Sequence, residues 1–376
     1  VRQVGAGIVL PAVESVARLA RELDHLIEGL KQVPPNRPGE EPPLLGEVLE
    51  LTALAERLRG TGLILAAMLA EEHADNEVRW VETDRGSDRF IRLFRCPLEV
   101  AGHLSEGVYD RMRAVVMTSA TLTVSRDFGF FSRRVGVDRV AASRLDQMML
   151  TSPFDFRAQA LLAIPTDGPE PDRQEFSAWL SDALLQIFEV TRGHALVLFT
   201  SFQSLRRAFR DLEQPLRHMG INPLWQGGAP RGKLLDTFRR DRSSVLFATD
   251  SFWEGIDVSG DALTCVILTK LPFRVPTEPV QEARCEAIER KGGNAFMDYS
   301  LPQAAIKLRQ GFGRLIRNRA DWGSVIILDR RVVTRRYGGV FLKSLPEVTL
   351  SKAPLREMLE ELRIFFNRHR STDSHE

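Results

Sequence analysis

The chain has 376 residues, 43% of them hydrophobic and 27% charged, and its formal net charge at pH 7 is +1. This length exceeds one typical domain and can bury a sizeable core. Because the net charge is nearly neutral, the composition gives no evidence for a nucleic-acid partner, and any such function must be argued from motifs. No segment reaches the ~18 apolar residues of a membrane span, and Cys96, Cys265 and Cys285 fit no zinc or iron–sulfur spacing, so we predict a cytoplasmic protein without a metal site of its own.

The first hundred residues are predicted to form two helices and a short hairpin. Apolar residues recur at helical spacing over Val13–Leu30 and again over the Leu- and Ala-rich segment Leu44–Glu72, with a proline-rich stretch between them. This pattern favours two helices packed on each other over an exposed binding surface. Two strand-like runs follow, Val78–Glu82 and Phe90–Phe94, joined by the polar turn Asp84–Asp88.

From about residue 110 the sequence alternates short β-branched runs with helical patterns. The predicted strands are Ala114–Thr118, Ala160–Ile164, Ala195–Thr200, Val245–Thr249, Thr264–Thr269 and Val325–Leu328. The predicted helices lie around Gln174–Val190, Leu205–Leu212, Gly232–Arg240, Pro279–Arg290 and Gln303–Arg317. Apolar strands separated by helices indicate an α/β fold with a parallel sheet covered on both faces. Ligands of such sheets bind at the carboxyl ends of the strands, so polar residues there are candidate site residues.

One predicted helix contains the sequence Gln-Gly-Phe-Gly-Arg-Leu-Ile-Arg, which begins at Gln310. Positions i, i+4 and i+7 share one face of a helix, so Gln310, Arg314 and Arg317 are predicted to project together. Two guanidinium groups on one edge suit the spread charge of a phosphoryl transition state. Gly311 and Gly313 each cost a helix roughly 1 kcal/mol against alanine, which indicates close approach of a backbone or ligand. The alternative for two arginines alone is a solvated basic face that docks on acidic neighbours.

A second candidate segment, Thr249–Asp257, directly follows a predicted strand and contains the sequence Ser-Phe-Trp-Glu-Gly-Ile-Asp. Its small hydroxyl residues and Gly255 can expose backbone N–H groups to a phosphate. Asp257 can accept a hydrogen bond from a ribose hydroxyl or steady a neighbouring arginine, and Trp253 can stack on a base or plug the domain surface. The alternative for the whole stretch is an ordinary strand-to-helix turn with a capping aspartate.

Two further segments end predicted strands with hydroxyl groups. In the first, Ser119 and Thr121 can relay between a nucleotide site and a second domain. In the second, Thr200 and Ser201 are placed to cap a helix or to hold a phosphate. Both signals are weak alone, because such turns are common and capping is the more frequent role. Gln226 begins a Gln-Gly-Gly sequence that fits a simple turn.

Taken in order, these segments resemble the later motifs of superfamily 2 helicases, specifically of the DinG/XPD family of DNA helicases. Met117–Leu122 is similar to motif III, Leu198–Phe202 to motif IV, Thr249–Asp257 to motif V and Gln310–Arg317 to motif VI. Further similar segments are Ser152–Phe154, Lys270–Phe273 and Asp298–Gln303. The similarity spans about residues 97–346, and the order of the motifs is specific although no single motif is. The helical stretch before residue 75 resembles the family only in its position, where an arch-like insertion lies between motifs II and III.

The resemblance implies a motor of two RecA-like domains that binds ATP in the cleft between them and moves 5′ to 3′ along single-stranded DNA. Residues 1–96 would form the helical arch-like segment with its hairpin, residues 97–125 the end of the first motor domain, and residues 126–376 the second RecA-like domain. By matching positions, Arg314 and Arg317 would face the triphosphate, with Gln310 beside them. The expected nucleotide-binding residues are Asp257, Gly255 and Glu254. The expected DNA-binding residues are Thr200, Ser201, Thr249, Ser251 and Trp253, and Ser119 and Thr121 would couple the two sites.

The chain departs from the family in one large respect. No Gly-x-x-x-x-Gly-Lys-[Ser/Thr] phosphate loop occurs in it, and no Asp-Glu-x-His segment. The family places both, and its four-cysteine iron–sulfur site, in the amino-terminal part of the first motor domain. Without the lysine and the magnesium-binding carboxylate no complete ATP site forms. We therefore expect a carboxy-terminal fragment, also suggested by its start at Val1, that alone neither hydrolyses ATP nor unwinds DNA and that needs ATP, Mg²⁺ and the amino-terminal motor domain to do so.

Two alternatives stay open at this stage. One is a stand-alone binding module that lost its ATPase half and serves as a partner or regulatory subunit. The other is half of an RNA helicase, against which the Ser-Phe-Trp-Glu-Gly sequence and the Lys-Leu-Pro-Phe run argue. In either case we expect binding through the nucleic-acid backbone with little sequence preference.

Overall fold

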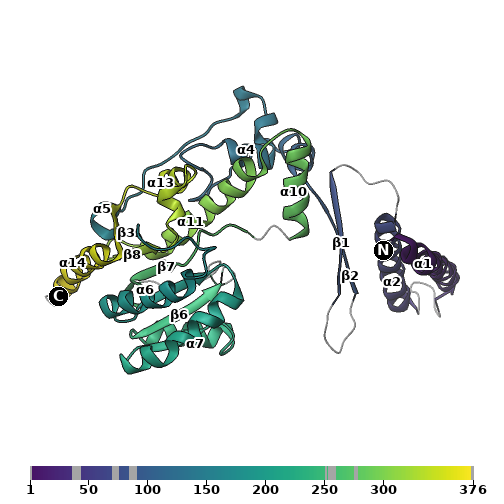
Figure 1. The fold of residues 1–376 in the computed structure, drawn as a ribbon. Helices are drawn as coiled ribbons and strands as arrows, with labels where there is room; N and C mark the ends of the chain where they lie inside the picture. The colour runs from purple at the N-terminus through teal and green to yellow at the C-terminus, as the bar shows by residue number, and fades with distance from the viewer. Residues whose placement is uncertain are drawn as a thin grey trace. The chain divides into compact units, whose positions relative to one another are not determined.

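The computed structural model describes residues 2–35, 44–69, 76–83, 91–249, 252, 260–274 and 278–373. The chain divides into two compact units, Val1–Glu99 and Val100–Glu376 (Figure 1). The domain boundaries expected at residues 96 and 125 stay a prediction.

The first unit begins with two helices that pack on each other. Helix α1 spans Arg2–Lys31 and helix α2 spans Leu45–Leu69, which confirms the two predicted helices. Ile27, Val48 and Ala55 are buried between them. Because these apolar residues face each other, the hairpin interpretation of the sequence is confirmed over the described residues.

A two-stranded antiparallel hairpin completes the first unit. Strand β1 covers Glu77–Thr83 and strand β2 covers Ile91–Pro97. Trp80 and Phe94 are directly opposite each other in the register, and their rings stack with centroids 4.8 Å apart. Such a cross-strand aromatic pair stabilises a hairpin. Both predicted strands are confirmed, while the predicted turn at residues 84–88 lies outside the described residues.

The second unit contains a seven-stranded sheet in the order β5-β6-β4-β7-β8-β3-β9, with every neighbouring pair parallel. The strands are β3 (Ala160–Pro165), β4 (Ala195–Phe199), β5 (Asn222–Trp225), β6 (Ser244–Thr249), β7 (Cys265–Leu268), β8 (Gly323–Ile327) and β9 (Thr349–Ala353). The helices are α3 (Ala101–Leu104), α4 (Gly129–Val135), α5 (Phe156–Gln159), α6 (Phe176–Thr191), α7 (Phe202–His218), α8 (Arg231–Arg240), α10 (Pro279–Arg290), α11 (Leu301–Leu315), α12 (Arg331–Thr334), α13 (Gly338–Ser344) and α14 (Leu355–Asp373). The predicted α/β class with a parallel sheet is confirmed.

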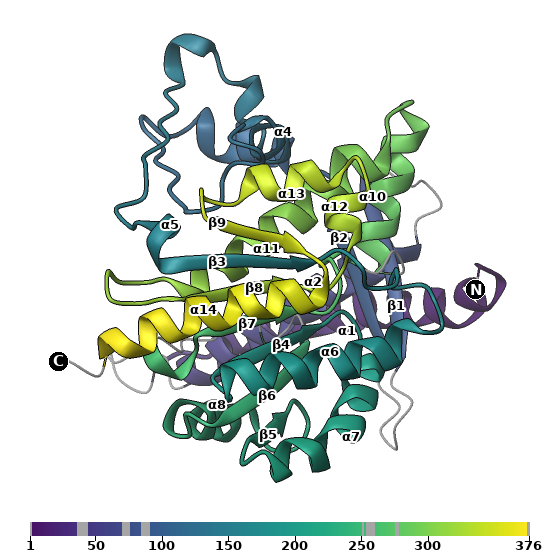
Figure 2. The same cartoon turned by 60° about the vertical axis from the view of Figure 1, so that its left-hand side comes forward.

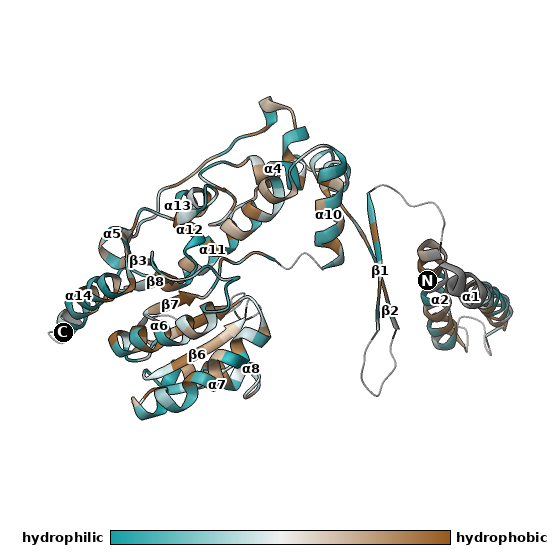
Figure 3. Ribbon diagram, viewed as in Figure 1, coloured by the Kyte–Doolittle hydropathy of each residue, from teal (hydrophilic) through white to brown (hydrophobic). Residues whose placement is uncertain are grey.

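Helices cover both faces of this sheet because successive strand residues point to opposite faces. On one face, Leu196 and Leu198 of β4 pack in a core that includes residues of α8, α11 and α13. On the other face, Val197 and Phe199 pack in a core with residues of α6, α7 and α14 (Figure 2). The central strands are hydrophobic along their length, whereas a covering helix such as α7 is apolar on one side only (Figure 3).

One predicted strand is wrong. Residues 114–118 form no strand and are exposed, with 87% of Val116 accessible to solvent. A β-branched run becomes a strand only when a neighbouring strand accepts its backbone hydrogen bonds, and no described residue of either unit does so. The sequence prediction also missed β5, β9 and the long helix α14. The two strands gave little signal because they are short and partly polar.

The described helices include none that is both long and apolar enough to cross a membrane. Cys265, on β7, is fully buried next to Ser324, and burial raises the pKa of its thiol to about 12. Since only the thiolate reacts, we expect a maleimide at neutral pH to modify Cys96 and Cys285, which are half-buried, but to spare Cys265 until the protein is denatured. Peptide mapping after a timed reaction measures this. Modification of all three thiols at one rate in the native chain would contradict the buried position of Cys265.

Candidate nucleotide and nucleic-acid sites

Helix α11 carries two of the three residues predicted for catalysis. Leu308 and Phe312 are buried in the core beneath the helix and fix its orientation on the sheet. Gln310 and Arg314, one turn apart, are both half-buried and share a side of the helix, as predicted. Among the described residues, no hydrogen bond or ion pair holds the Arg314 guanidinium. Its five N–H donors are therefore available to a ligand outside the described structure.

Arg317 lies outside α11, which corrects one part of the prediction. The helix ends at Leu315, and Ile316 is extended with φ −115° and ψ 113°. The i+7 spacing thus does not place Arg317 on the helical face of Gln310 and Arg314. The cause is Asp321, a buried carboxylate that accepts hydrogen bonds from the backbone N–H groups of Arg317 and Asn318 at 2.8 and 3.0 Å. These bonds replace the helical hydrogen bonds and form a loop.

A buried glutamine that the sequence analysis missed holds the same loop by hydrogen bonds to its backbone. Gln159, at the end of α5, donates from Nε2 to the carbonyl oxygens of Asn318, Arg319 and Asp321 at 3.1, 3.1 and 2.8 Å. Since Gln159 immediately precedes β3, this ties the loop carrying Arg317 to the neighbouring strand. No local pattern marks such a residue, because its partners are about 160 positions away in the sequence.

The segment that contains Ser119 and Thr121 forms an exposed turn whose hydroxyls lie 3.3 Å apart. No hydrogen bond joins either hydroxyl to α11, but Thr123, two residues further, accepts a hydrogen bond from Nη1 of Arg309 at 2.9 Å. Thr123 is buried. Arg309 is itself partly buried, and this loss of solvation lowers the pKa of its guanidinium. The contact between this segment and the helix of Gln310 is therefore made by residues that the sequence analysis did not select.

The glycine in the last turn of α11, Gly313, is exposed, and a Cβ added there would meet no described atom within 4 Å. At Gly313, therefore, no described residue makes the close approach expected from the sequence, whereas Gly311 is buried. We predict that Gly313→Ala stabilises the chain by about 0.5–1 kcal/mol, because alanine loses less backbone entropy in a helix. Urea unfolding monitored by circular dichroism measures this. An unchanged or lower midpoint would contradict it.

Thr200 and Ser201 lie where β4 passes into α7, at the carboxyl end of the strand. Ser201 caps α7: its Oγ accepts a hydrogen bond from the backbone N–H of Ser204 at 3.2 Å and lies 2.8 Å from the Ser204 hydroxyl. The capping alternative for Ser201 is thus correct in the structure. Thr200 instead is half-buried and lines a cavity beside this helix end.

Thr249 ends β6 at the same edge of the sheet. Its backbone N–H and its hydroxyl both donate to Oε1 of Gln226, each at 2.8 Å. The backbone N–H of Gln226 donates in turn to Phe247, so this side chain joins the carboxyl ends of β5 and β6. The Gln-Gly-Gly sequence is therefore more than a simple turn. Ser251, Trp253, Glu254, Gly255 and Asp257 lie outside the described residues.

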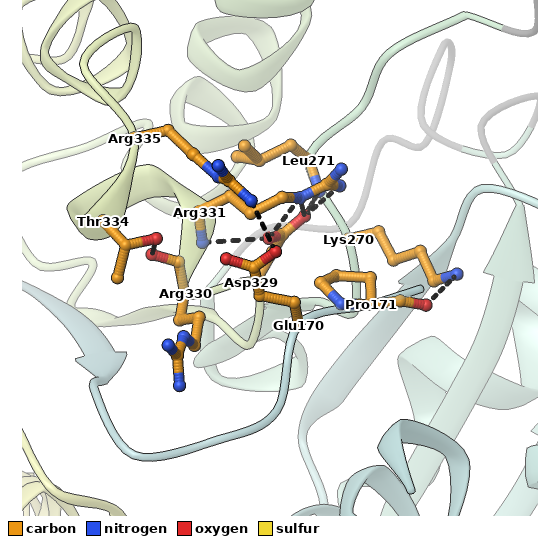
Figure 4. A network of polar contacts seen from close by, with 9 residues as sticks. All are labelled: Glu170, Pro171, Lys270, Leu271, Asp329, Arg330, Arg331, Thr334 and Arg335. Carbon is orange, nitrogen blue, oxygen red and sulfur yellow. Dashed lines mark hydrogen bonds and ion pairs between the residues drawn. The ribbon is translucent and has the colours of Figure 1, made fainter. Parts of the chain in front are cut away.

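A polar network that the sequence analysis missed follows β8 (Figure 4). Asp329 is completely buried, and its carboxylate accepts from Nε and Nη2 of Arg331 at 2.9 and 2.6 Å and from the backbone N–H of Leu271 at 2.9 Å. The last bond fixes the Lys-Leu-Pro-Phe segment after β7. Arg335 extends the network to Glu170 with an ion pair of 2.7 Å.

The topology places these features at two opposite edges of the sheet. In a parallel sheet all carboxyl ends share one edge, so Thr200, Thr249 and the residues after β7 lie together. Helix α11 ends just before β8 begins, so Arg314 lies toward the amino-terminal edge. No described group of three His, Cys, Asp or Glu residues is placed to hold a metal ion.

Comparison with known proteins identifies the relatives of this chain. Residues 184–348 match the model of the family described as "Helicase C-terminal domain". The chain is 39% identical to the ATP-dependent DNA helicase YoaA of Haemophilus influenzae over 80% of its own length and 45% of that protein. It is 36% identical to the 3′-5′ exonuclease DinG of Bacillus subtilis over 74% of its length and 30% of that protein.

This chain is related to the DinG-like helicases. It spans less than half the length of these curated relatives. The match to the helicase family model includes β4, α7, β6 and α11, and thus the elements of both candidate sites, whereas Ser119 and Thr121 precede the matched residues 184–348. The fold agrees: the structure of Xpd4 from S. tokodaii superposes with a TM-score of 0.51 at 15% identity and covers 93% of this chain and 70% of that one.

Proposed function

We propose that this chain is the carboxy-terminal part of an ATP-dependent DNA helicase and supplies the arginine-bearing half of its motor. The observation that carries the proposal is Arg314, on the last turn of α11 inside the matched helicase domain, with no partner for its guanidinium among the described residues. A half-buried arginine without an acidic neighbour suits a phosphate supplied from outside.

In this function Arg314 stabilises the negative charge that develops on the transferred phosphoryl group, and Gln310 lies beside it on the same helix. Arg317 contributes from the loop that Asp321 and Gln159 hold. Asp257, Gly255 and Glu254 bind the nucleotide. Magnesium binding belongs to carboxylates of the amino-terminal motor domain in this proposal, because the Asp-Glu-x-His segment does not occur in this sequence.

The carboxyl edge of the sheet binds the DNA backbone in this proposal, through Thr200 and, outside the described residues, Ser251 and Trp253. Thr249 and Ser201 mainly keep the neighbouring chain in position for DNA, because their hydroxyl groups are already hydrogen-bonded to Gln226 and Ser204. Ser119 and Thr121 couple the two sites through the segment that Arg309 anchors at Thr123. Movement in the 5′ to 3′ direction follows from the family resemblance.

The purified chain tests the proposal in its simplest form. We expect it to bind single-stranded DNA with an affinity that falls as salt rises and hardly changes with base composition, because the contacts are to phosphates. We expect no DNA-stimulated ATP turnover, because the phosphate loop and its lysine are missing from the sequence. Fluorescence anisotropy and a coupled phosphate assay measure the two properties.

Two results would count against this function. Strong preference for one base sequence would favour a sequence-reading module, and DNA-stimulated ATP turnover by the chain alone would show that a complete site exists within it. A higher affinity for single-stranded RNA than for DNA of equal length would favour the RNA helicase alternative.

A further inference from the structure

A cavity of about 330 Å³ lies at the carboxyl edge of the sheet, where β4 and β7 end. Residues of three segments line it: the loop before α6 together with the first turns of α6, the end of β4 with the first turns of α7, and the residues that follow β7. Its cations are Arg173, Arg207 and Lys270, and hydroxyl groups are contributed by residues that include Thr200 and Ser204. None of the described residues that line it is acidic.

The charge of this cavity contrasts with that of its neighbour. A second cavity of about 270 Å³ shares Arg173 but is also lined by Glu170 and Glu175. The ion pair between Glu170 and Arg335 neutralises part of the charge that lines this second cavity. Three cations with hydroxyl groups and no carboxylate create a positive potential, which favours an anionic ligand in the first cavity.

The structure holds Lys270 in place at this cavity. Its Nζ donates to the carbonyl oxygen of Pro171 at 3.2 Å and lies 5.4 Å from the ring centroid of Phe176. The next residue, Leu271, is fixed by its backbone hydrogen bond to the buried Asp329 (Figure 4). Lys270 is thus a preorganised cation, and two of its three N–H donors remain for a ligand.

Arg207 provides a second, different kind of cation. It is exposed on α7, one turn after the capped end of the helix, and no carboxylate pairs with it among the residues that the structure describes. The amino-terminal ends of α6 and α7 both border the cavity, and the positive ends of their helix dipoles add to its positive potential.

We propose that this cavity binds backbone phosphates of single-stranded DNA, with Arg207 and Lys270 as the principal cations and Thr200 as a hydrogen-bond donor. The inference rests on the proposed function and adds binding residues that the sequence motifs do not contain. Phosphate rather than base is the group bound, because Phe176, the one aromatic ring among the described lining residues, is 96% buried. The opposite edge of the sheet carries Arg314, which separates this site from the nucleotide.

Arg207→Ala in the chain as it stands tests the site, with labelled oligothymidylate as the probe and fluorescence anisotropy as the readout over a series of salt concentrations. The matched control is Arg217→Ala, which removes the same charge from the same helix about 15 Å further along its axis and alters only an exposed pair with Glu213. Since Arg207 is exposed, the substitution leaves the fold intact, which circular dichroism verifies.

We expect Arg207→Ala to weaken binding roughly tenfold at low salt and to reduce the slope of log affinity against log salt by about 0.7, the loss of one phosphate contact. Arg207→Glu has a larger effect of the same sign, and Lys270→Gln adds a further loss. If both Arg207 variants behave like Arg217→Ala while the unaltered chain binds DNA, the site is overturned and the proposed function stands. If the unaltered chain binds no DNA, both fall. Tighter, Arg207-dependent binding of oligouridylate overturns the assignment to DNA.

Discussion

Arg314→Ala is expected to abolish ATP turnover in a protein that joins this chain to a phosphate loop and its magnesium-binding carboxylates, and to leave single-stranded DNA binding nearly unchanged. The expected loss of kcat is on the order of a thousandfold, because an arginine that faces a transferring phosphoryl group stabilises charge that exists only in the transition state. Arg314 lies toward the edge of the sheet opposite Thr200, so its removal does not disturb the proposed DNA contacts.

Two further variants make this result specific. Arg319→Ala removes an equal charge from the exposed loop beyond α11 and is expected to retain turnover. Arg314→Lys keeps the charge but loses the planar arrangement of donors, and we expect it to recover little activity. Steady-state phosphate release and DNA anisotropy are measured on the same preparations. Equal loss of turnover and DNA binding in Arg314→Ala would indicate a structural role for this side chain.

The second large effect is expected from Arg331→Ala, which should lower the free energy of unfolding by about 3 kcal/mol. The substitution leaves the carboxylate of Asp329 buried without its cation, and removing one member of a buried ion pair typically costs about 3–5 kcal/mol. We expect the lower end because the Arg331 side chain is 28% exposed, so that water can reach part of the site in its absence. Urea unfolding followed by circular dichroism measures the change.

Arg335→Ala is the control for this measurement. Its ion pair with Glu170 belongs to the same network, but the Arg335 side chain is 52% exposed. We expect a far smaller loss of unfolding free energy than for Arg331→Ala, as for other exposed pairs. Asp329→Asn in the Arg331→Ala background removes the buried charge and keeps an acceptor for the N–H of Leu271, so it should recover part of the lost stability. A further loss in the double variant would show that charge burial is not the cause.

The position of Arg317 shows where sequence periodicity stops being informative. Spacing alone assigned Gln310, Arg314 and Arg317 to one helical face, and it was right for the first two. The helix ends at Leu315 because Asp321 and Gln159 provide hydrogen bonds to the loop that follows. Gln159 comes from a segment about 160 residues earlier, so no local pattern contains this information.

The same distinction separates the confirmed strands from the wrong one. Residues 160–164 and 245–249 became strands because parallel neighbours on both sides accept their backbone hydrogen bonds. Residues 114–118 are richer in β-branched residues but have no such neighbour in the described part of the chain, and Val116 is left exposed. Propensity describes what a segment can form, whereas pairing depends on what lies beside it.

Three features follow from the amino-acid sequence alone: the α/β class, five of the seven sheet strands, and the order of motifs that points to Gln310 and Arg314. These depend on short-range periodicity and on residue types at fixed spacing, both of which are local properties. Folding is what takes Arg317 out of the helix, connects the coupling segment to α11 through Thr123 and Arg309, and lets Asp329 fix the residues after β7. It also brought Lys270 and Arg207, 63 positions apart, to one cavity without a carboxylate. Each of these is a contact between distant segments, and its free energy depends on burial and geometry that exist only after the sheet and its helices have assembled.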